Sequence, residues 1–541
     1  MSPTERILTP ISHEDGVTCY YSVTTPPDDS IAVVHLYPSR VIPVIFVPGV
    51  MGSNLKSNDG KNTPVWTVNS KLGVARAWIF KNAAQRKQLL DPDKTEVDER
   101  GELPSGSSLS ETEMRRRGWG TVLNAFYGDF LVWLENHLHD YAVCETGLRA
   151  NMMEKDKAPE VPGLSFDEVE NSYRYDFPVY AVGYNSLQSN IDSAKHLADE
   201  IWSIINHYQT KKKPQKCEKV ILVTHSMGGL VARWFSGVDG RTTAEAAKEG
   251  QQTPGREKVM GIVHGVMPTT GSGETYARVR QGTKGADGLV MGSDAAKMTA
   301  VFAQSPGPLQ LLPSVQYGMG WLRIIAGSGY SLSLPKVEPY SEIYTQRDRW
   351  WGLIQSKLIN PLDVTHGNVD KDWKNLKDII YKKVKPFHDG LYDAQKGCGK
   401  FHPCTYVFYG DDAEKKTYGE VIWRQSGGAS NSVTSPAVDD SVLNAASIVD
   451  TLVGTEIIGN PGNRFAQMTF EIWDPSDNGD GTVPTRSGSA PNGQKGVLLC
   501  KGYAGIDHAA AYMSEQQRRF ALWSIVKIAV EVKNTSLAYE R

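Results

Sequence analysis

The stretch that most constrains the fold of this chain is residues 219–235, KVILVTHSMGGLVARWF. An apolar run of strand length ends in a histidine and a serine, two glycines follow, and a helical pattern then begins at once. Glycine allows two backbone segments to approach closely where the chain reverses its direction. The pattern therefore predicts a buried strand joined to a helix by a tight turn, with Ser226 at the turn.

Other apolar runs of strand length, each closed by Gly, Pro, Asn or His, indicate a sheet around this strand. They lie at residues 41–49, 178–185, 259–265, 405–410 and 496–502. Between two of the strands, residues 186–209 place apolar side chains at helical spacing, which is typical of a helix that crosses over a sheet. Alternating strands and helices predict an α/β fold with a mostly parallel, doubly wound sheet.

The connection between the strands at 259–265 and 405–410 is about 140 residues long, far more than a strand-to-helix connection needs. We therefore expect residues 1–270 and 400–541 to form the α/β core and residues 271–399 to form an inserted, mainly helical cap or lid. A second long excursion is expected within the core at residues 52–118.

Within the expected cap, residues 306–335 carry Arg323 as their single charge. Gly and Pro residues interrupt the segment, which argues against a membrane-spanning helix. Two interpretations remain open. The segment either packs the cap onto the sheet or forms a mobile apolar lid, in which Leu312, Trp321 and Ile324 would contact a substrate.

Composition excludes several classes of protein. The formal net charge of -3 and the pI near 6.5 show no basic excess, so a nucleic-acid partner is not expected. The N-terminus lacks the basic and apolar regions of a secretory signal peptide, so the chain is expected to be made in the cytoplasm without Sec export. No apolar run reaches the length of about 18 residues that would indicate a transmembrane helix.

Six cysteines are too few for a disulfide framework in a chain of 541 residues. Only Cys398 and Cys404 lie close together, and a zinc site would need closer spacing and a second ligand pair. A plain loop or a local disulfide is therefore expected there. A calcium loop counted from Asp474 would need a glutamate where Thr485 stands, so no metal or other cofactor is expected.

Ser226 needs a histidine base, because a serine hydroxyl is a poor nucleophile at neutral pH. His508 is the preferred base, since it follows the last strand after a short loop. His225 is held within the turn itself, and His264 ends the next strand, so a structural role is expected for both.

The third member of such a triad is a carboxylate that orients the histidine. In this fold the partners follow the nucleophile in the order Ser, Asp, His, each after a later strand. Asp480, between two glycines in DPSDNGDGTVP, is the preferred carboxylate. Its rivals are Asp474, Asp477 and Asp507.

A Gly-rich loop after the first strong strand, FVPGVMGSNL, can direct backbone N–H groups at a developing oxyanion. Either Val50 or Met51 would supply one donor from this loop. Met227, directly after the serine, would supply the second.

Together, VPGVMGSNL, VTHSMGGLVAR, YVFYGDDAEKKTYGEVIW, GDGTVP and GIDHAA resemble the lecithin:cholesterol acyltransferase and GPI-inositol-deacylase-like branch of α/β-hydrolases. The phrases RRGWGTVLNAFYGDFLVWLE and PVYAVGYNSLQSN are similar more specifically to bacterial lipase effectors of type VI secretion. This resemblance implies a lipase or phospholipase that a secretion apparatus delivers into the periplasm of a rival cell, with a cognate immunity protein in the producer.

We therefore expect a serine hydrolase that cleaves carboxylic esters of membrane lipids or phospholipids. Transfer of the acyl group to an alcohol, hydrolysis of small esters or peptides, and a non-catalytic binding role on a hydrolase scaffold remain alternatives.

Overall fold

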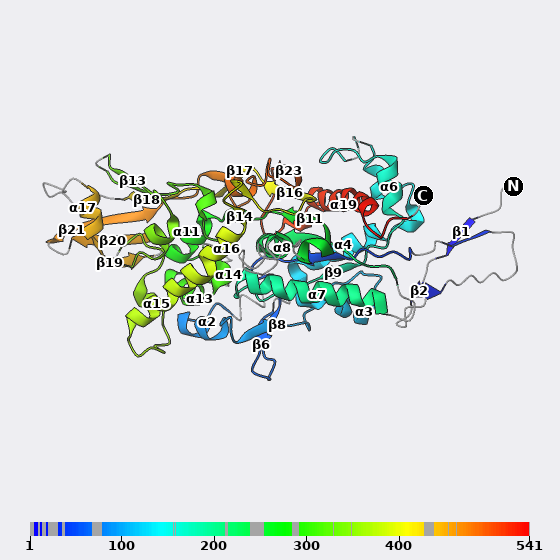
Figure 1. Ribbon diagram of the computed structural model, residues 1–541. Helices are drawn as coiled ribbons and strands as arrows, with labels where there is room; N and C mark the ends of the chain where they lie inside the picture. Colours follow the sequence, from blue (N-terminus) through cyan, green and yellow to red (C-terminus); the bar gives the residue numbers. More distant parts are fainter. Residues whose placement is uncertain are drawn as a thin grey trace.

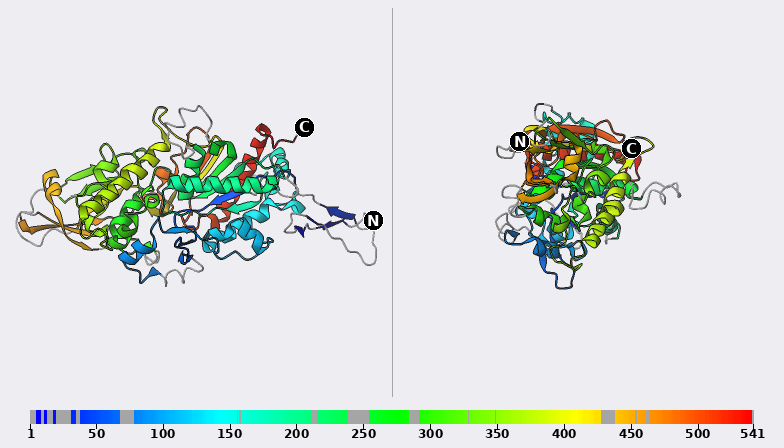
Figure 2. Two further views of the ribbon diagram at one scale, coloured as in Figure 1. Left: turned by 60° about the horizontal axis from the view of Figure 1, so that its bottom comes forward. Right: turned by 90° about the vertical axis from the view of Figure 1, so that its left-hand side faces the viewer.

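The described residues of the computed structural model form two lobes along one long axis, and the N-terminal strands project beyond one end (Figures 1 and 2). These strands are β1 (Glu5–Leu8), β2 (Ile11–Ser12), β3 (Thr18–Cys19) and β4 (Ile31–Val34). From residue 38 onward the structure describes the chain except for 68–77, 155, 157, 211–214, 238–253, 284–290, 328, 348, 427–437, 453, 461–462 and 540–541.

The first lobe is built on a six-stranded, entirely parallel sheet in the order β23-β16-β11-β10-β5-β9. Its strands are β5 (Val44–Val47), β9 (Val179–Ala181), β10 (Val220–His225), β11 (Val259–Gly265), β16 (Thr405–Gly410) and β23 (Val497–Tyr503). Each strand coincides with a predicted apolar run. Five of the strands are buried along almost their whole length, which calls for apolar side chains on both faces, whereas the edge strand β23 is mostly half-buried.

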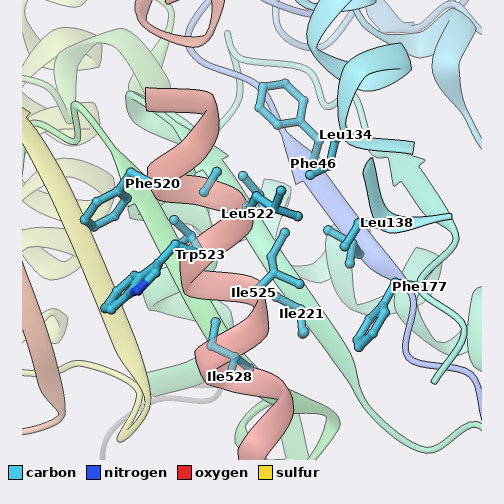
Figure 3. Packing of buried hydrophobic residues seen from close by; sticks show 14 of the residues in the cluster. Phe46, Leu134, Leu138, Phe177, Ile221, Phe520, Leu522, Trp523, Ile525 and Ile528 are labelled. Atoms are coloured by element: carbon cyan, nitrogen blue, oxygen red, sulfur yellow. The ribbon is translucent and has the colours of Figure 1, made fainter. Parts of the chain in front are cut away.

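Helices cover both faces of this sheet. On one face lie α4 (Asn124–Leu138) and α19 (Glu515–Ala529), and on the other lie α7 (Asn190–Thr210) and α8 (Met227–Gly237). Alternate strand residues enter the two cores: Ile221 packs on the side of α19 (Figure 3), whereas Leu222 packs on the side of α8. The predicted doubly wound α/β-hydrolase fold is confirmed.

The strand order changes direction beside β5. The chain passes from β5 outward to β9, returns to β10 on the other side of β5, and then continues outward in the opposite direction. In open α/β sheets, ligands bind beyond the carboxyl ends of the strands at such a switch point. The loop after β5 and the turn after β10 therefore meet at the place where a site is expected.

The second lobe contains its own six-stranded sheet, in the order β13-β12-β18-β21-β20-β19. Its strands are β12 (Leu322–Ile325), β13 (Ser331–Leu334), β18 (Val421–Gln425), β19 (Ser447–Leu452), β20 (Thr455–Asn460) and β21 (Asn463–Ile472). The predicted boundary at residue 400 passes through this sheet, because strands from both sides of it pair with one another. The expected helical cap therefore also has a β-sheet, and residues 421–472 lie with it rather than with the core.

The second lobe also contains several helices. They include α11 (Gly273–Gln281), α13 (Ala295–Phe302), α14 (Pro306–Leu309), α15 (Val369–Ile379), α16 (Lys385–Gly390) and α17 (Asp440–Ala445). The second lobe has a separate apolar core rich in Trp and Tyr.

The expected excursion at residues 52–118 forms a small three-stranded sheet beside the first lobe. It contains β6 (Leu55–Ser57), β7 (Pro64–Trp66), β8 (Thr95–Val97), α2 (Ala83–Leu89) and α3 (Glu111–Arg116). Further short elements of the described chain are α5 (Leu148–Asn151), α6 (Phe166–Ser172), α10 (Pro254–Lys258), α18 (Thr485–Gly488), β14 (Tyr392–Asp393), β15 (Cys398–Gly399), β17 (Asp412–Thr417) and β22 (Asp477–Gly479).

Candidate active site

Ser226 occupies the turn between β10 and α8 with φ of 52°, a left-handed conformation that is strained for a residue with a side chain. A Cβ added to Gly228 would lie 2.4 Å from the carbonyl oxygen of Pro48 and 2.5 Å from that of Val47. No side chain fits at that separation, so glycine is required where α8 crosses the end of β5. The turn has the geometry of a nucleophile elbow.

Thr224 stands where such a turn usually has glycine, and the structure shows how the larger side chain is accommodated. It is fully buried, and its hydroxyl lies 2.9 Å from Nδ1 of His264. The Tyr512 hydroxyl donates to the Thr224 carbonyl oxygen at 2.8 Å. The neighbouring strand and the C-terminal segment therefore provide polar partners for this position.

The structure brings the predicted serine, histidine and aspartate together. His508 Nε2 lies 2.9 Å from Ser226 Oγ, and His508 Nδ1 lies 2.9 Å from Asp480 Oδ2. Asp480 is 1% exposed, and its Oδ1 accepts the N–H groups of Thr482 at 2.9 Å and Val483 at 2.7 Å. The carboxylate is thus fixed by its own loop and presents its second oxygen to the imidazole.

The rival carboxylates take other partners. Asp477 Oδ2 accepts the N–H of Glu420 at 3.0 Å, and Asp507 Oδ2 lies 3.3 Å from Lys415 Nζ. Asp474 is exposed. Among the described residues, Asp480 is the acidic side chain that hydrogen-bonds the His508 ring.

His225 links two parts of the site that the sequence analysis did not connect. Its Nε2 lies 2.8 Å from the His508 carbonyl oxygen, so Nε2 carries a proton and donates. Burial and the nearby His508 lower the pKa of His225 to about 3, so the ring is neutral and its Nδ1 accepts from the Tyr127 hydroxyl at 3.0 Å. Tyr127 in turn accepts the N–H of Gly49 at 3.2 Å.

This chain of hydrogen bonds ties the loop after β5 to the backbone of the candidate base. The His508 N–H also donates to the Asp480 carbonyl oxygen at 3.0 Å, so both backbone polar groups of His508 are held. No residue spacing indicates Tyr127, which lies on α4 within one of the stretches that carry the family resemblance.

The predicted oxyanion donors differ in availability. Met51 has a φ of 57°, and its N–H donates to Ser186 Oγ at 3.0 Å. The N–H groups of Val50 and Met227 have no acceptor among the described residues. Of the two alternatives in the loop after β5, the hydrogen bonding therefore favours Val50 as the donor that accompanies Met227.

The structure does not place the predicted lid residues at this site. Leu312, Trp321 and Ile324 are each 0% exposed and belong to the core of the second lobe. Ile324 lies on β12, which has a paired strand on both sides. The burial and the strand pairing therefore favour the packing interpretation of residues 306–335, because an interior strand can move away only by breaking two ladders of backbone hydrogen bonds.

Metal ligands, cysteine pairs and membrane-spanning helices are three other features that were considered from the sequence. Within the described ranges, no group of three His, Cys, Asp or Glu side chains could hold a metal, and Cys398 and Cys404 are free thiols. None of the helices found there is long and apolar enough to cross a membrane.

Four histidines of the described part of the chain are buried, and burial is the first cause that lowers the pKa of each. The pKa is lowered to about 3 for His225 and His264 and to about 4 for His388 and His402. These four buried histidines are therefore neutral in the folded protein at neutral pH.

The parallel sheet and the elbow at its switch point define the class of the protein, which is an α/β-hydrolase fold. Residues 166–243, which include β9, α7, β10 and α8, match the family described as PGAP1-like alpha/beta domain. The chain is similar to Tle4, solved as the Tle4–Tli4 complex, with 28% identity and a TM-score of 0.69 over 90% of this chain and 98% of that chain.

A further solved structure, phospholipase PlaB from Legionella pneumophila, shares 12% identity with a TM-score of 0.18 over 84% of this chain and 83% of that chain. A similarity at that level carries no argument about fold or activity. No curated protein sequence matches this chain significantly.

Proposed function

We propose that the protein is a serine hydrolase that cleaves carboxylic esters of lipids, with phospholipids as its substrates. The observation that carries the proposal is the alignment of Ser226, His508 and Asp480 through two hydrogen bonds of 2.9 Å each. Similarity to Tle4 along most of the chain and the match to the PGAP1-like domain support the same class.

In the proposed mechanism, His508 Nε2 takes the proton of Ser226 as Oγ attacks the ester carbonyl carbon. Asp480 holds the proton on Nδ1 and stabilises the imidazolium that forms. The N–H groups of Val50 and Met227 bind the negative charge that develops on the carbonyl oxygen. His508 then protonates the departing alcohol, and the acyl group remains on Ser226.

A water molecule completes the reaction. His508 takes one proton from the water, the resulting hydroxide attacks the acyl carbon, and the fatty acid leaves as Ser226 recovers its proton. If a lipid alcohol took the place of this water, the product would be a new ester, which is the acyltransferase alternative.

The proposed setting is contact-dependent delivery by type VI secretion into the periplasm of a rival cell, with a cognate immunity protein in the producer. The resemblance of two sequence stretches to such effectors motivates this setting. The similarity to Tle4, which was solved together with Tli4, supports the existence of a protein partner.

One experiment tests the activity. The purified chain and its Ser226→Ala form are incubated with phospholipid vesicles, triglyceride emulsions and short soluble esters, and the products are identified by mass spectrometry. Release of fatty acid from phospholipid by the native chain alone is expected. If neither form acts on any of the three kinds of substrate while both remain folded, the chain is a binding protein on a hydrolase scaffold.

A further inference from the structure

A cavity of about 230 Å³ lies between the two lobes, beside the C-terminal half of α8. Its walls come from α8, the loop after β11, the segments around α14 and α16, and the turn that follows α18. Ser226, Asp480 and His508 are not among the residues that line it. The cavity is therefore distinct from the candidate triad, although α8 links the two.

Arg233 on α8 is one of the residues that line this cavity, and it is only 3% exposed. Its Nε, Nη1 and Nη2 donate to the carbonyl oxygens of Lys400, Thr269 and Leu391 at 3.3, 3.2 and 3.2 Å. The ring of Phe401 covers the guanidinium at 4.2 Å. A guanidinium has five N–H groups, so these carbonyls leave two of them available.

Arg233 forms no ion pair with a carboxylate in the part of the chain that the structure describes. Two other buried arginines are neutralised in that way: Arg149 pairs with Asp140 and Arg280 pairs with Glu456, each at 2.5 Å. A buried charge without a counter-ion is costly, and carbonyl dipoles offset only part of that cost. Burial lowers the pKa of Arg233 to about 9, so the group is still charged at neutral pH.

We propose that this cavity is a binding site for a phosphate group, with Arg233 as its counter-charge. Guanidinium groups bind phosphate oxygens through paired N–H donors. Two further residues that line the cavity can donate hydrogen bonds. The side-chain oxygen of Gln494 accepts the Gly399 N–H at 2.9 Å, which leaves its amide nitrogen to donate, and Tyr392 has a phenol hydroxyl. Donors from several directions suit a tetrahedral phosphate better than a planar carboxylate.

The size of the cavity limits the ligand to a phosphate with a small substituent, because pockets that enclose whole drug-sized molecules exceed about 300 Å³. Two sources could supply the phosphate: the head group of a phospholipid substrate or a free phosphate ion. The head-group source rests on the proposed function. Arg233 follows Ser226 by seven residues on α8, which corresponds to about 10 Å along the helix axis.

The test uses the full chain carrying Ser226→Ala, so that no substrate is consumed. Titration calorimetry and ³¹P NMR line broadening measure the binding of inorganic phosphate, with acetate and chloride compared at equal ionic strength. Two variants probe the cavity: Arg233→Gln removes the charge, and Ala490→Leu adds a larger side chain to the wall while leaving Arg233 unchanged. Arg424→Gln, an exposed position in the second sheet, is the matched control.

We expect phosphate to bind at least about tenfold more weakly to both cavity variants and unchanged to the control. Arg233→Gln removes a charge-assisted hydrogen bond, and Ala490→Leu fills space that the phosphate would occupy. Ala490→Leu decides the question if Arg233→Gln fails to fold. Equal binding to all forms, absence of binding, or an equal response to acetate overturns the proposal.

Micelles of a short-chain diether phosphatidylcholine, which has no ester to cleave, distinguish the two sources. If the micelles displace phosphate from the native cavity, and this displacement is lost in both cavity variants, the ligand of the site is the phospholipid head group. Phosphate binding without such competition identifies the free ion, and either result supports the site. An inactive native chain that still binds phosphate refutes the proposed function and leaves the phosphate site standing.

Discussion

Replacing Asp480 by asparagine tests the candidate triad at its most sharply defined point. Asp480 Oδ1 faces two donors, the N–H groups of Thr482 and Val483, and Oδ2 faces His508 Nδ1. In Asp480→Asn the amide oxygen must remain with the two N–H groups, so the amide nitrogen faces His508. Nδ1 then has to accept a hydrogen bond, the ring proton moves to Nε2, and the imidazole can no longer take a proton from Ser226.

The structure also sets the size of the effect. His508 regains the tautomer with the proton on Nδ1 only if the side-chain amide of Asp480→Asn flips and presents its oxygen to the imidazole. The N–H groups of Thr482 and Val483 then face the NH₂ group instead of an acceptor. Each buried donor left without an acceptor costs about 1–3 kcal/mol, so the flip costs about 2–6 kcal/mol. This energy corresponds to a fall in kcat of roughly 30-fold to 20,000-fold. KM should change little, because the side chain does not contact the acyl chain of the substrate in the proposed mechanism.

The assay is steady-state hydrolysis of a short soluble ester by Asp480→Asn, with Asp477→Asn and Asp507→Asn as matched controls. Both controls make the same chemical change at carboxylates that bond elsewhere. We expect them to retain kcat within a few-fold. A folded Asp480→Asn protein with native kcat, or an equal loss in Asp507→Asn, would refute the reasoning.

Three further results are expected. Ser226→Ala should lower ester hydrolysis by at least about 10⁴-fold with an unchanged circular dichroism spectrum, because no other hydroxyl is held by His508 in the described structure. Trp321→Ala should lower the free energy of unfolding by about 3–5 kcal/mol, measured by urea titration, because it empties a fully buried site. The protein should lose stability as the pH falls below about 6.5, by up to about 1.4 kcal/mol per pH unit for each of the four buried histidines, which charge only when the chain unfolds.

Each result has a clear contrary outcome. Near-native activity of Ser226→Ala would remove the serine mechanism. If Trp321→Ala kept native stability and lost activity on lipid alone, residues 306–335 would act as a lid. For the pH dependence, equal urea midpoints at pH 7.5 and pH 5 would show that the buried histidines do not control stability.

His139 has the opposite effect on the pH dependence of stability from the four buried histidines. Burial lowers the pKa of His139, but Glu135 and Asp176 outweigh that effect, so its pKa is raised and its contribution to stability is lost as the pH rises. A single group of this kind does not reverse the trend set by four.

The sequence alone was sufficient to predict the six strands of the first lobe and the elbow that holds Ser226. Both depend on information local to the chain: apolar runs identify strands buried on both faces, and Gly228 marks a place where two backbones nearly touch. Asp480 and His508 could be proposed as well, since the order of triad members along the chain narrows the choice to the loops after late strands.

Tertiary structure decided what depends on contacts between distant residues. Met51 is separated from Ser186 by 135 positions, and Tyr127 is separated from His225 by 98. No local pattern could therefore show that the Met51 N–H is bonded to Ser186, or that the Tyr127–His225 pair connects two parts of the site. The same reason explains the second lobe. An apolar segment such as 306–335 has the same composition whether it covers a substrate or completes a core. The pairing of β12 with the strand at 421–425, about a hundred residues away, favours the core, and no local pattern could show that pairing.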